Sequence, residues 1–148
     1  MIELRSEKDT EGLAARLAAG LPAGSLLLLR GPLGAGKTTL VRYLARALGF
    51  GGRVTSPTYT LMHTYPTPAG DLLHVDVYRL PEATAIYDLG FEEARENAYL
   101  TAVEWGEPTD FPGGLELIIE PAETGLRRVT FVAHRPELQE LVDRLGNG

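Results

Sequence analysis

The first part of the chain alternates between helix-like and strand-like hydrophobic patterns. Leucines recur every four positions over Leu13–Leu21, which predicts an amphipathic helix ending before Pro22. Ser25–Arg30 is almost uniformly apolar, as is typical of a parallel strand that is covered on both faces. Residues 37–48 return to helical spacing and stop at a glycine. This succession predicts a buried strand between two helices that pack on a sheet.

The rest of the chain favours shorter elements. Alternation over residues 59–65 and 72–78, with prolines and a glycine between them, predicts a β-hairpin. Residues 80–97 carry a proline and two carboxylate-rich stretches, which predict short helices broken at Leu89-Gly90. A further strand, a late strand pair and a closing helix are expected over residues 99–105, 115–120, 127–133 and 136–145.

The residues between the first strand and the second helix form a complete phosphate-loop motif. Residues 31–38 read Gly-Pro-Leu-Gly-Ala-Gly-Lys-Thr, which fits G-x-x-x-x-G-K-[ST]. Glycines let successive N–H groups curl around a phosphate, and the helix that follows adds the positive end of its dipole. Lys37 would reach the β- and γ-phosphates, and the Thr38 hydroxyl would ligate Mg²⁺. Nucleotide binding is therefore the first hypothesis, against the alternative of a glycine-rich turn with a surface lysine.

Lysine usage supports this hypothesis. Of 14 basic residues 12 are arginine, so one of only two lysines stands where a phosphate loop requires it. Together with the pattern of elements, the motif predicts an α/β, P-loop NTPase-like three-layer fold, with a mixed β-sheet and an antiparallel hairpin insertion. We expect a single P-loop ATPase domain over residues 1–148.

The amino-acid composition limits the classes of function and the cellular location that fit this chain. The chain has no cysteine, which excludes disulfides, thiol catalysis and thiolate metal sites and fits a cytoplasmic protein. No apolar run is long enough for a membrane span, so we expect no membrane contact. The net charge of −6 argues against a chain that grips nucleic acid by itself.

Two carboxylates stand where a phosphate loop needs acidic partners for its metal and its attacking oxygen. Glu104 ends an apolar strand, and Asp76 lies in a mixed strand whose alternation places His74, Asp76 and Tyr78 on one face. Three polar groups on one face suggest a site. For His74, a hydrogen-bonded structural histidine is the favoured interpretation, because a lone histidine is seldom a ligand.

Three further features have two interpretations each. Thr55-Ser56-Pro57-Thr58 follows the phosphate-loop helix, where a switch segment or a simple turn could lie. Arg79 could neutralise charge on a transferred phosphoryl group or form a salt bridge. Trp105 could lie beside the nucleotide or pack at a strand end.

Taken together, the motifs resemble the TsaE (YjeE) family of bacterial ATPases over nearly the whole chain. The segments that carry the resemblance occur in order at residues 31–39, 55–61, 74–80 and 103–105. The departures are mild: Pro32 stands where an acidic residue is common, and Gly106 follows the tryptophan where proline or alanine is frequent.

The resemblance implies a role in making threonylcarbamoyladenosine beside the anticodon of tRNA. In the family scheme TsaE does not transfer the threonylcarbamoyl group; it joins TsaB and TsaD and supports their turnover through ATP hydrolysis, with Mg²⁺ as the metal. Contact with tRNA would be indirect, through that complex, which accords with an acidic chain.

The resemblance also implies residue roles. The phosphate cradle would be Gly34, Ala35, Gly36, Lys37, Thr38 and Thr39. Thr38 and Glu104 would ligate Mg²⁺, and Asp76 would position or activate water, although sequence does not separate its role from that of Glu104. Lys37, Asp76 and Glu104 form the expected catalytic set. Trp105 would neighbour the nucleotide, the threonines and serine of residues 55–58 would form a switch-like loop, and Thr10 would lie near the base.

Two alternatives share the phosphate loop. A small-molecule or nucleoside kinase would need an acceptor pocket and a lid, for which residues 80–97 are the available segment and Arg95 its one arginine. A nucleotide-gated interaction module would bind without hydrolysis, which the intact lysine, threonine and carboxylates argue against. A GTPase is disfavoured, because the chain has no Asn-Lys-x-Asp sequence.

Overall fold

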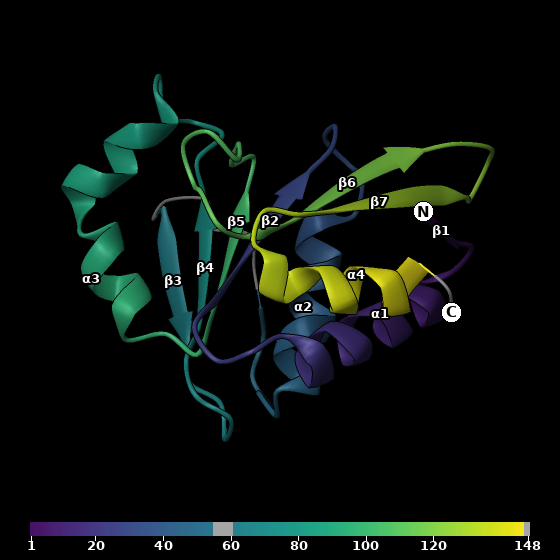
Figure 1. Cartoon of the computed structure of the whole chain (residues 1–148), viewed down its shortest axis with the longest axis horizontal. Helices are drawn as coiled ribbons and strands as arrows, with labels where there is room; N and C mark the ends of the chain where they lie inside the picture. Colours follow the sequence, from purple (N-terminus) through teal and green to yellow (C-terminus); the bar gives the residue numbers. More distant parts are fainter. Residues whose placement is uncertain (55–60, 147–148) are drawn as a thin grey trace.

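The chain folds around one seven-stranded mixed sheet (Figure 1). The computed structural model describes residues 1–54 and 61–146. The strands are β1 (Ile2–Leu4), β2 (Ser25–Arg30), β3 (Met62–Tyr65), β4 (Leu72–Asp76), β5 (Leu100–Glu104), β6 (Leu115–Pro121) and β7 (Arg127–Ala133). They lie in the order β1-β7-β6-β2-β5-β4-β3.

The centre of the sheet is parallel and its margins are antiparallel. Strand β2 pairs in parallel with β5 and β6, and β5 pairs in parallel with β4. Antiparallel pairs then close both sides: β3 on β4, β7 on β6 and β1 on β7. The predicted mixed sheet and the predicted hairpin of β3 and β4 are therefore confirmed. The carboxyl ends of β2, β5 and β4 all reach the same edge of the sheet.

Helices cover both faces of the sheet, which confirms the three-layer prediction. They are α1 (Glu7–Gly20), α2 (Lys37–Ala47), the 3₁₀ helix η1 (Ala83–Leu89), α3 (Phe91–Glu96), the 3₁₀ turn η2 (Pro136–Leu138) and α4 (Gln139–Gly146). Figure 1 shows α1, α2 and α4 on one side and α3 on the other. The broken helix pair expected over residues 80–97 corresponds to η1 and α3, with Gly90 at a left-handed φ of 90° between them.

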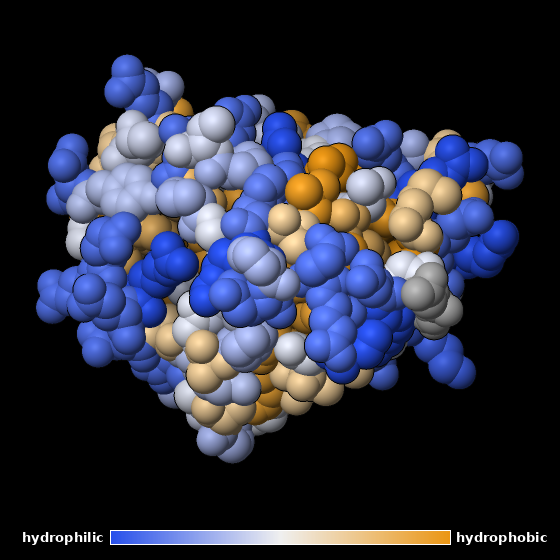
Figure 2. Space-filling view, viewed as in Figure 1, coloured by the Kyte–Doolittle hydropathy of each residue, from blue (hydrophilic) through white to orange (hydrophobic). Residues whose placement is uncertain are grey.

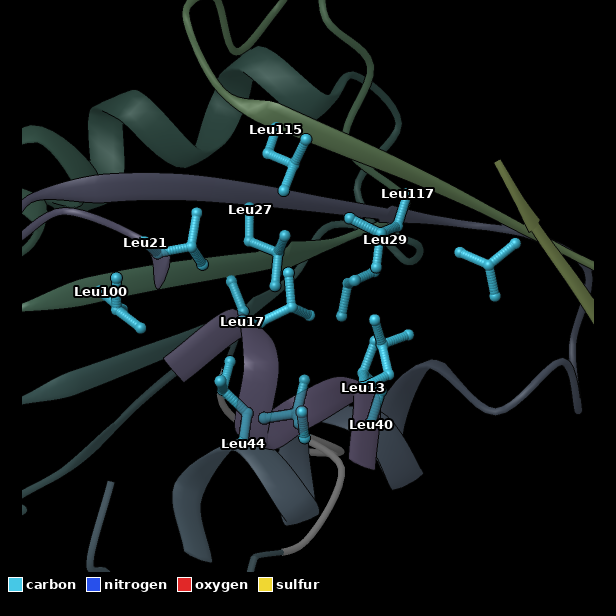
Figure 3. Close-up of a cluster of buried hydrophobic side chains, with 14 of the residues drawn as sticks. Leu13, Leu17, Leu21, Leu27, Leu29, Leu40, Leu44, Leu100, Leu115 and Leu117 are labelled. Carbon is cyan, nitrogen blue, oxygen red and sulfur yellow. The ribbon is translucent and has the colours of Figure 1, made fainter. Parts of the chain in front are cut away.

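The apolar strand β2 supplies both layers of the core. Leu27 and Leu29 pack with the leucines of α1 and α2 (Figure 3), whereas Leu26 and Leu28 join a second cluster with Ile86 and Phe91. Successive strand residues point to opposite faces, so a strand covered on both sides must be apolar throughout. This is why residues 25–30 lack the alternation of a half-exposed strand.

Local signals account for the ends of the first helix. The Ser6 side chain caps α1 by accepting the backbone N–H of Asp9 at 3.4 Å. At the other end, a Cβ on Gly20 would lie 2.5 Å from Leu141, so glycine lets α4 approach α1 closely.

Several expectations about boundaries were wrong or incomplete. Strand β1 was not predicted, since three residues are too few to show alternation and it forms by pairing with β7. The strand expected over 72–78 ends at Asp76, whose carboxylate accepts the N–H of Tyr78 at 2.9 Å and turns the chain. Residues 59 and 60 of the first hairpin strand lie outside the described residues.

The visible surface is mostly hydrophilic, with an apolar area over β6 and β7 (Figure 2). Among the described helices, none has the length and apolarity that crossing a bilayer requires. The cytoplasmic location remains a prediction.

An ionic cluster around the buried Glu116 ties β2 and β6 to the end of β7. Glu116 is 3% exposed, accepts a hydrogen bond from Arg30 and lies 2.8 Å from Nε2 of His134. Burial by itself raises the pKa of Glu116, but the hydrogen bonds from Arg30 and His134 outweigh it, so the pKa lies below its ordinary value. The ionised carboxylate is therefore part of the folded state.

This cluster predicts a dependence of stability on pH. A lowered pKa in the folded state stabilises the protein above the carboxyl pKa of the unfolded chain, about 4.3, and this contribution is lost as pH falls through the folded pKa. We expect Glu116→Gln to lower the free energy of unfolding at pH 7 by about 1–3 kcal/mol and to flatten its acid dependence. Urea unfolding between pH 3 and 7 measures both effects. The control is Glu120→Gln, an exposed position on the same strand, and equal pH slopes in wild type and Glu116→Gln would contradict the prediction.

Candidate nucleotide site

The phosphate-loop motif spans the connection between β2 and α2, and its glycines meet specific backbone demands. Gly31 has φ 152°, and a Cβ there would lie 2.3 Å from the carbonyl oxygen of Ile119. Gly36 has φ 106° and forms the N-cap of α2 in the left-handed region. The loop can therefore run tightly past β6 and present the N-terminal N–H groups of α2 to a cleft.

Lys37 is held inside this loop. It is only 4% exposed, and Nζ donates to the carbonyl oxygens of Gly31 at 2.6 Å and Pro32 at 2.9 Å. Nζ also lies 4.1 Å from the centroid of the Trp105 ring, within cation–π range. Burial lowers the pKa of Lys37, while the charges of Glu104 and Asp76 act in the opposite direction.

Glu104 is the most constrained carboxylate of the site. It is 3% exposed at the end of β5. The Thr38 hydroxyl lies 3.1 Å and 3.0 Å from its two oxygens, and Nε2 of His74 lies 2.5 Å from Oε2. The side chain thus joins the first turn of α2 to the two neighbouring strands β4 and β5.

Asp76 lies beside Glu104 in the sheet. The parallel register of β4 and β5 pairs these two residues, so both carboxylates stand at the same edge. Burial raises the pKa of Asp76; the N–H of Tyr78 lowers it, and the negative charge of Glu104 raises it further. A carboxylate with a raised pKa is a better proton acceptor than an ordinary aspartate.

Trp105 leaves β5 in a strained conformation. Its φ of 69° makes it the one non-glycine residue with a left-handed backbone in the described ranges. Its backbone N–H donates to the carbonyl oxygen of Leu29 at 2.9 Å, and the centroid of its ring lies 4.6 Å from that of Tyr78. Such strain is found where surrounding contacts hold a side chain in a functional position. The prediction that Tyr78 shares a strand face with His74 and Asp76 is wrong, because β4 ends at Asp76 and the chain turns before Tyr78.

One cleft of about 550 Å³ brings the predicted residues together. Its lining includes Thr10, Gly34, Ala35, Gly36, Lys37, Thr38, Thr39, Asp76, Arg79, Glu104 and Trp105. His74 does not line it but supports it from below, which fits the favoured interpretation of a hydrogen-bonded histidine. The switch-like loop expected at Thr55, Ser56 and Thr58 lies outside the described residues. The chemical role of each lining residue remains a prediction.

Arg127 was missed by sequence reasoning. It begins β7, lines the cleft, and donates from Nη2 to the carbonyl oxygen of Gly34 at 2.9 Å. The two residues are 93 positions apart in the chain. No local signal in residues 121–127 distinguishes this arginine, because its position follows from the pairing of β6 and β7.

The oxygen atoms at Thr38 and Glu104 suit a hard divalent cation. The Thr38 hydroxyl lies 3.0 Å from one Glu104 oxygen, and hydroxyl and carboxylate oxygens are ligands that Mg²⁺ prefers. Residues 1–54 and 61–146 hold no group of three or more His, Asp or Glu side chains that could form a metal cage.

Comparison with known proteins places this chain in a family. The model of the family described as "Threonylcarbamoyl adenosine biosynthesis protein TsaE" matches residues 4–129. The chain belongs to the TsaE family. The resemblance inferred from the motifs is thereby confirmed.

Individual relatives agree over most of the chain. The tRNA threonylcarbamoyladenosine biosynthesis protein TsaE of Aquifex aeolicus is 42% identical over 128 residues, covering 85% of this chain and 90% of the relative. The protein of the same name from Rickettsia felis is 36% identical over 149 residues, covering 98% and 86%. The crystal structure of YdiB from Bacillus subtilis superposes with a TM-score of 0.77 at 28% identity, covering 99% of this chain and 93% of YdiB.

Substitution of Arg127 tests whether the cleft of this TsaE-family chain binds nucleotide. Replacing Arg127 by Ala removes one positive charge from the cleft, and we expect nucleotide affinity to fall about 2- to 5-fold, the effect of one partly solvated charge. Quenching of Trp105, the single tryptophan, on titration with ADP measures this affinity. Arg128→Ala is the matched control, since Arg128 makes the same charge change at the next position outside the cleft. Equal affinities for the two variants would contradict the prediction.

Proposed function

We propose that this TsaE-family chain is a Mg²⁺-dependent ATPase that acts in the formation of threonylcarbamoyladenosine on tRNA. The observation that carries the proposal is the convergence of Lys37, Thr38, Asp76 and Glu104 at the N-terminus of α2, in one cleft. The curated relatives named above bear that pathway in their names. Family and site chemistry thus support the same function.

Each residue has a part that follows from its position. The N–H groups of residues 34–39 and the Lys37 ammonium would bind the β- and γ-phosphates and offset their charge. Thr38 and Glu104 would hold Mg²⁺, which when bound neutralises charge on the phosphate oxygens. Thr38 and His74 already form hydrogen bonds with the Glu104 carboxylate. Asp76 would therefore be the carboxylate that orients the attacking water and accepts its proton.

The partners proposed are TsaB and TsaD, with tRNA contacted through their complex. The net charge of −6 supports indirect contact, since a chain that binds RNA alone normally presents a basic surface. In this scheme the chain does not transfer the threonylcarbamoyl group; its ATP hydrolysis supports repeated turnover of the complex.

The structure of residues 80–97 argues against the lid that the kinase alternative needs. Residues 80–97 were the available lid segment, yet Ile86 of η1 and Phe91 of α3 are fully buried against the sheet. A segment that forms a layer of the core cannot open and close over a substrate without unfolding that layer. The fold therefore favours hydrolysis over transfer to a small acceptor.

Lysine replacement tests the main proposal. Lys37→Ala removes the cation of the phosphate loop, and we expect ATP hydrolysis to be abolished both alone and with TsaB, TsaD and tRNA. ADP release measures the rate, and the variant of the other lysine, Lys8→Ala on the exposed face of α1, is the control. Wild-type turnover in Lys37→Ala would remove the proposed function. Hydrolysis by the wild type that does not respond to the partners would remove the proposed complex while leaving the ATPase.

The two carboxylates can be told apart by kinetics. We expect Asp76→Asn to lower kcat on the order of 10²-fold with little change in the Mg²⁺ requirement, since proton acceptance is lost while the shape is kept. Glu104→Ala should instead raise the Mg²⁺ concentration needed for half-maximal rate and weaken hydrolysis more than nucleotide affinity. Rates at several Mg²⁺ concentrations separate the two effects. An unchanged rate in Glu104→Ala would assign its catalytic part to Asp76.

A further inference from the structure

The histidine beneath the cleft contacts the carboxylate that is proposed to meet the metal. His74 is wholly buried in β4, and its partner Glu104 is 3% exposed in β5. In the parallel register His74 stands opposite Ala102, so Glu104 lies two residues further on the same face. The bond of 2.5 Å from Nε2 to Oε2 therefore runs diagonally between two strands of the core.

The direction of this bond follows from its partners. An ionised carboxylate can only accept hydrogen bonds, so Nε2 of His74 carries the proton and donates it. Nδ1 has no hydrogen-bond partner among the described residues. The Tyr65 ring lies beside the imidazole, with centroids 6.3 Å apart. Glu104 is thus the group in the described structure that compensates the burial of this polar ring.

The burial of the imidazole by itself gives no reason for histidine at this position. A buried polar atom without a partner costs about 1–3 kcal/mol, and an apolar side chain of similar size would avoid that cost. Its neighbours on the same face of the sheet, Leu72 of β4 and Ala102 of β5, are apolar and fully buried. The ring therefore serves the carboxylate that it contacts.

The carboxylate needs a second donor for a chemical reason. Thr38 has one hydroxyl proton, so it can donate to one oxygen of Glu104 at a time. When that proton is directed to Oε1, Thr38 no longer serves Oε2. His74 then remains as the fixed donor, and Oε2 keeps its direction.

We propose that His74 is a positioning residue that fixes the Glu104 carboxylate for Mg²⁺ binding. The inference rests on the proposed function, because it assumes that Glu104 meets the metal of a bound nucleotide. Groups that orient a metal ligand in this way typically change metal affinity or activity by about 10- to 100-fold when removed.

Two substitutions separate positioning from folding. His74→Gln keeps an N–H donor near the position of Nε2, whereas His74→Leu keeps the volume and removes the donor. His63→Leu is the control, since His63 pairs with His74 across β3 and β4 but contacts Tyr65 rather than Glu104. The experiment measures ADP affinity by Trp105 fluorescence at a series of Mg²⁺ concentrations, kcat and KM for ATP, and Tm without ligand.

We expect His74→Leu to raise the Mg²⁺ concentration for half-maximal ADP affinity about 10-fold and to lower kcat about 10- to 100-fold. Affinity for ADP without Mg²⁺ and the KM for ATP should change little, so that the loss is confined to the Mg²⁺ response and to kcat. His74→Gln should recover most of the Mg²⁺ response, and His63→Leu should match the wild type.

Other results overturn the inference. A wild-type Mg²⁺ response in His74→Leu would show that Glu104 does not need the donor. Equal losses in the Gln and Leu variants that follow a lowered Tm would show a purely structural role. A wild type that binds no nucleotide would overturn the proposed function and this inference together, whereas an active wild type with an unaffected Leu variant overturns this inference alone.

Discussion

Parallel pairing of β2, β5 and β4 is the constraint on which the site depends. It carries the phosphate loop, Glu104 and Asp76 to one edge of the sheet, although they lie far apart in the chain. The same alignment buries both faces of β2, so the strand that leads into the loop is held by two apolar layers. The loop therefore starts from a rigid support, and its glycines need only make the turn past β6 into α2.

Two charged side chains at this edge of the sheet are buried and held by hydrogen bonds. Lys37 and Glu104 are nearly inaccessible, and both are compensated by hydrogen bonds from the loop, Thr38 or His74. Buried charges persist only with such partners. Burial lowers the pKa of the Lys37 ammonium, and the charges of Glu104 and Asp76 both act to raise it against that effect.

Aromatic residues complete the wall of the cleft. The left-handed backbone of Trp105 places its ring beside the Lys37 ammonium and against Tyr78. The turn made by Asp76 brings Tyr78 to that position. The Asp76 carboxylate thus lines the cleft and also stabilises the turn that follows β4. That turn brings Tyr78 into contact with Trp105 at the end of β5.

Much of the molecule could be predicted from local patterns. The motif at residues 31–38 and the apolar run of β2 predicted the fold class, because periodicity and turn chemistry are encoded over a few residues. The motif and the carboxylates at the ends of β4 and β5 also predicted residues that line the cleft. Tertiary structure decided the rest. The bond from Arg127 to Gly34, the strand β1 and the contact of His74 with Glu104 each join residues distant in the chain, and they depend on register and strand order that no local pattern records.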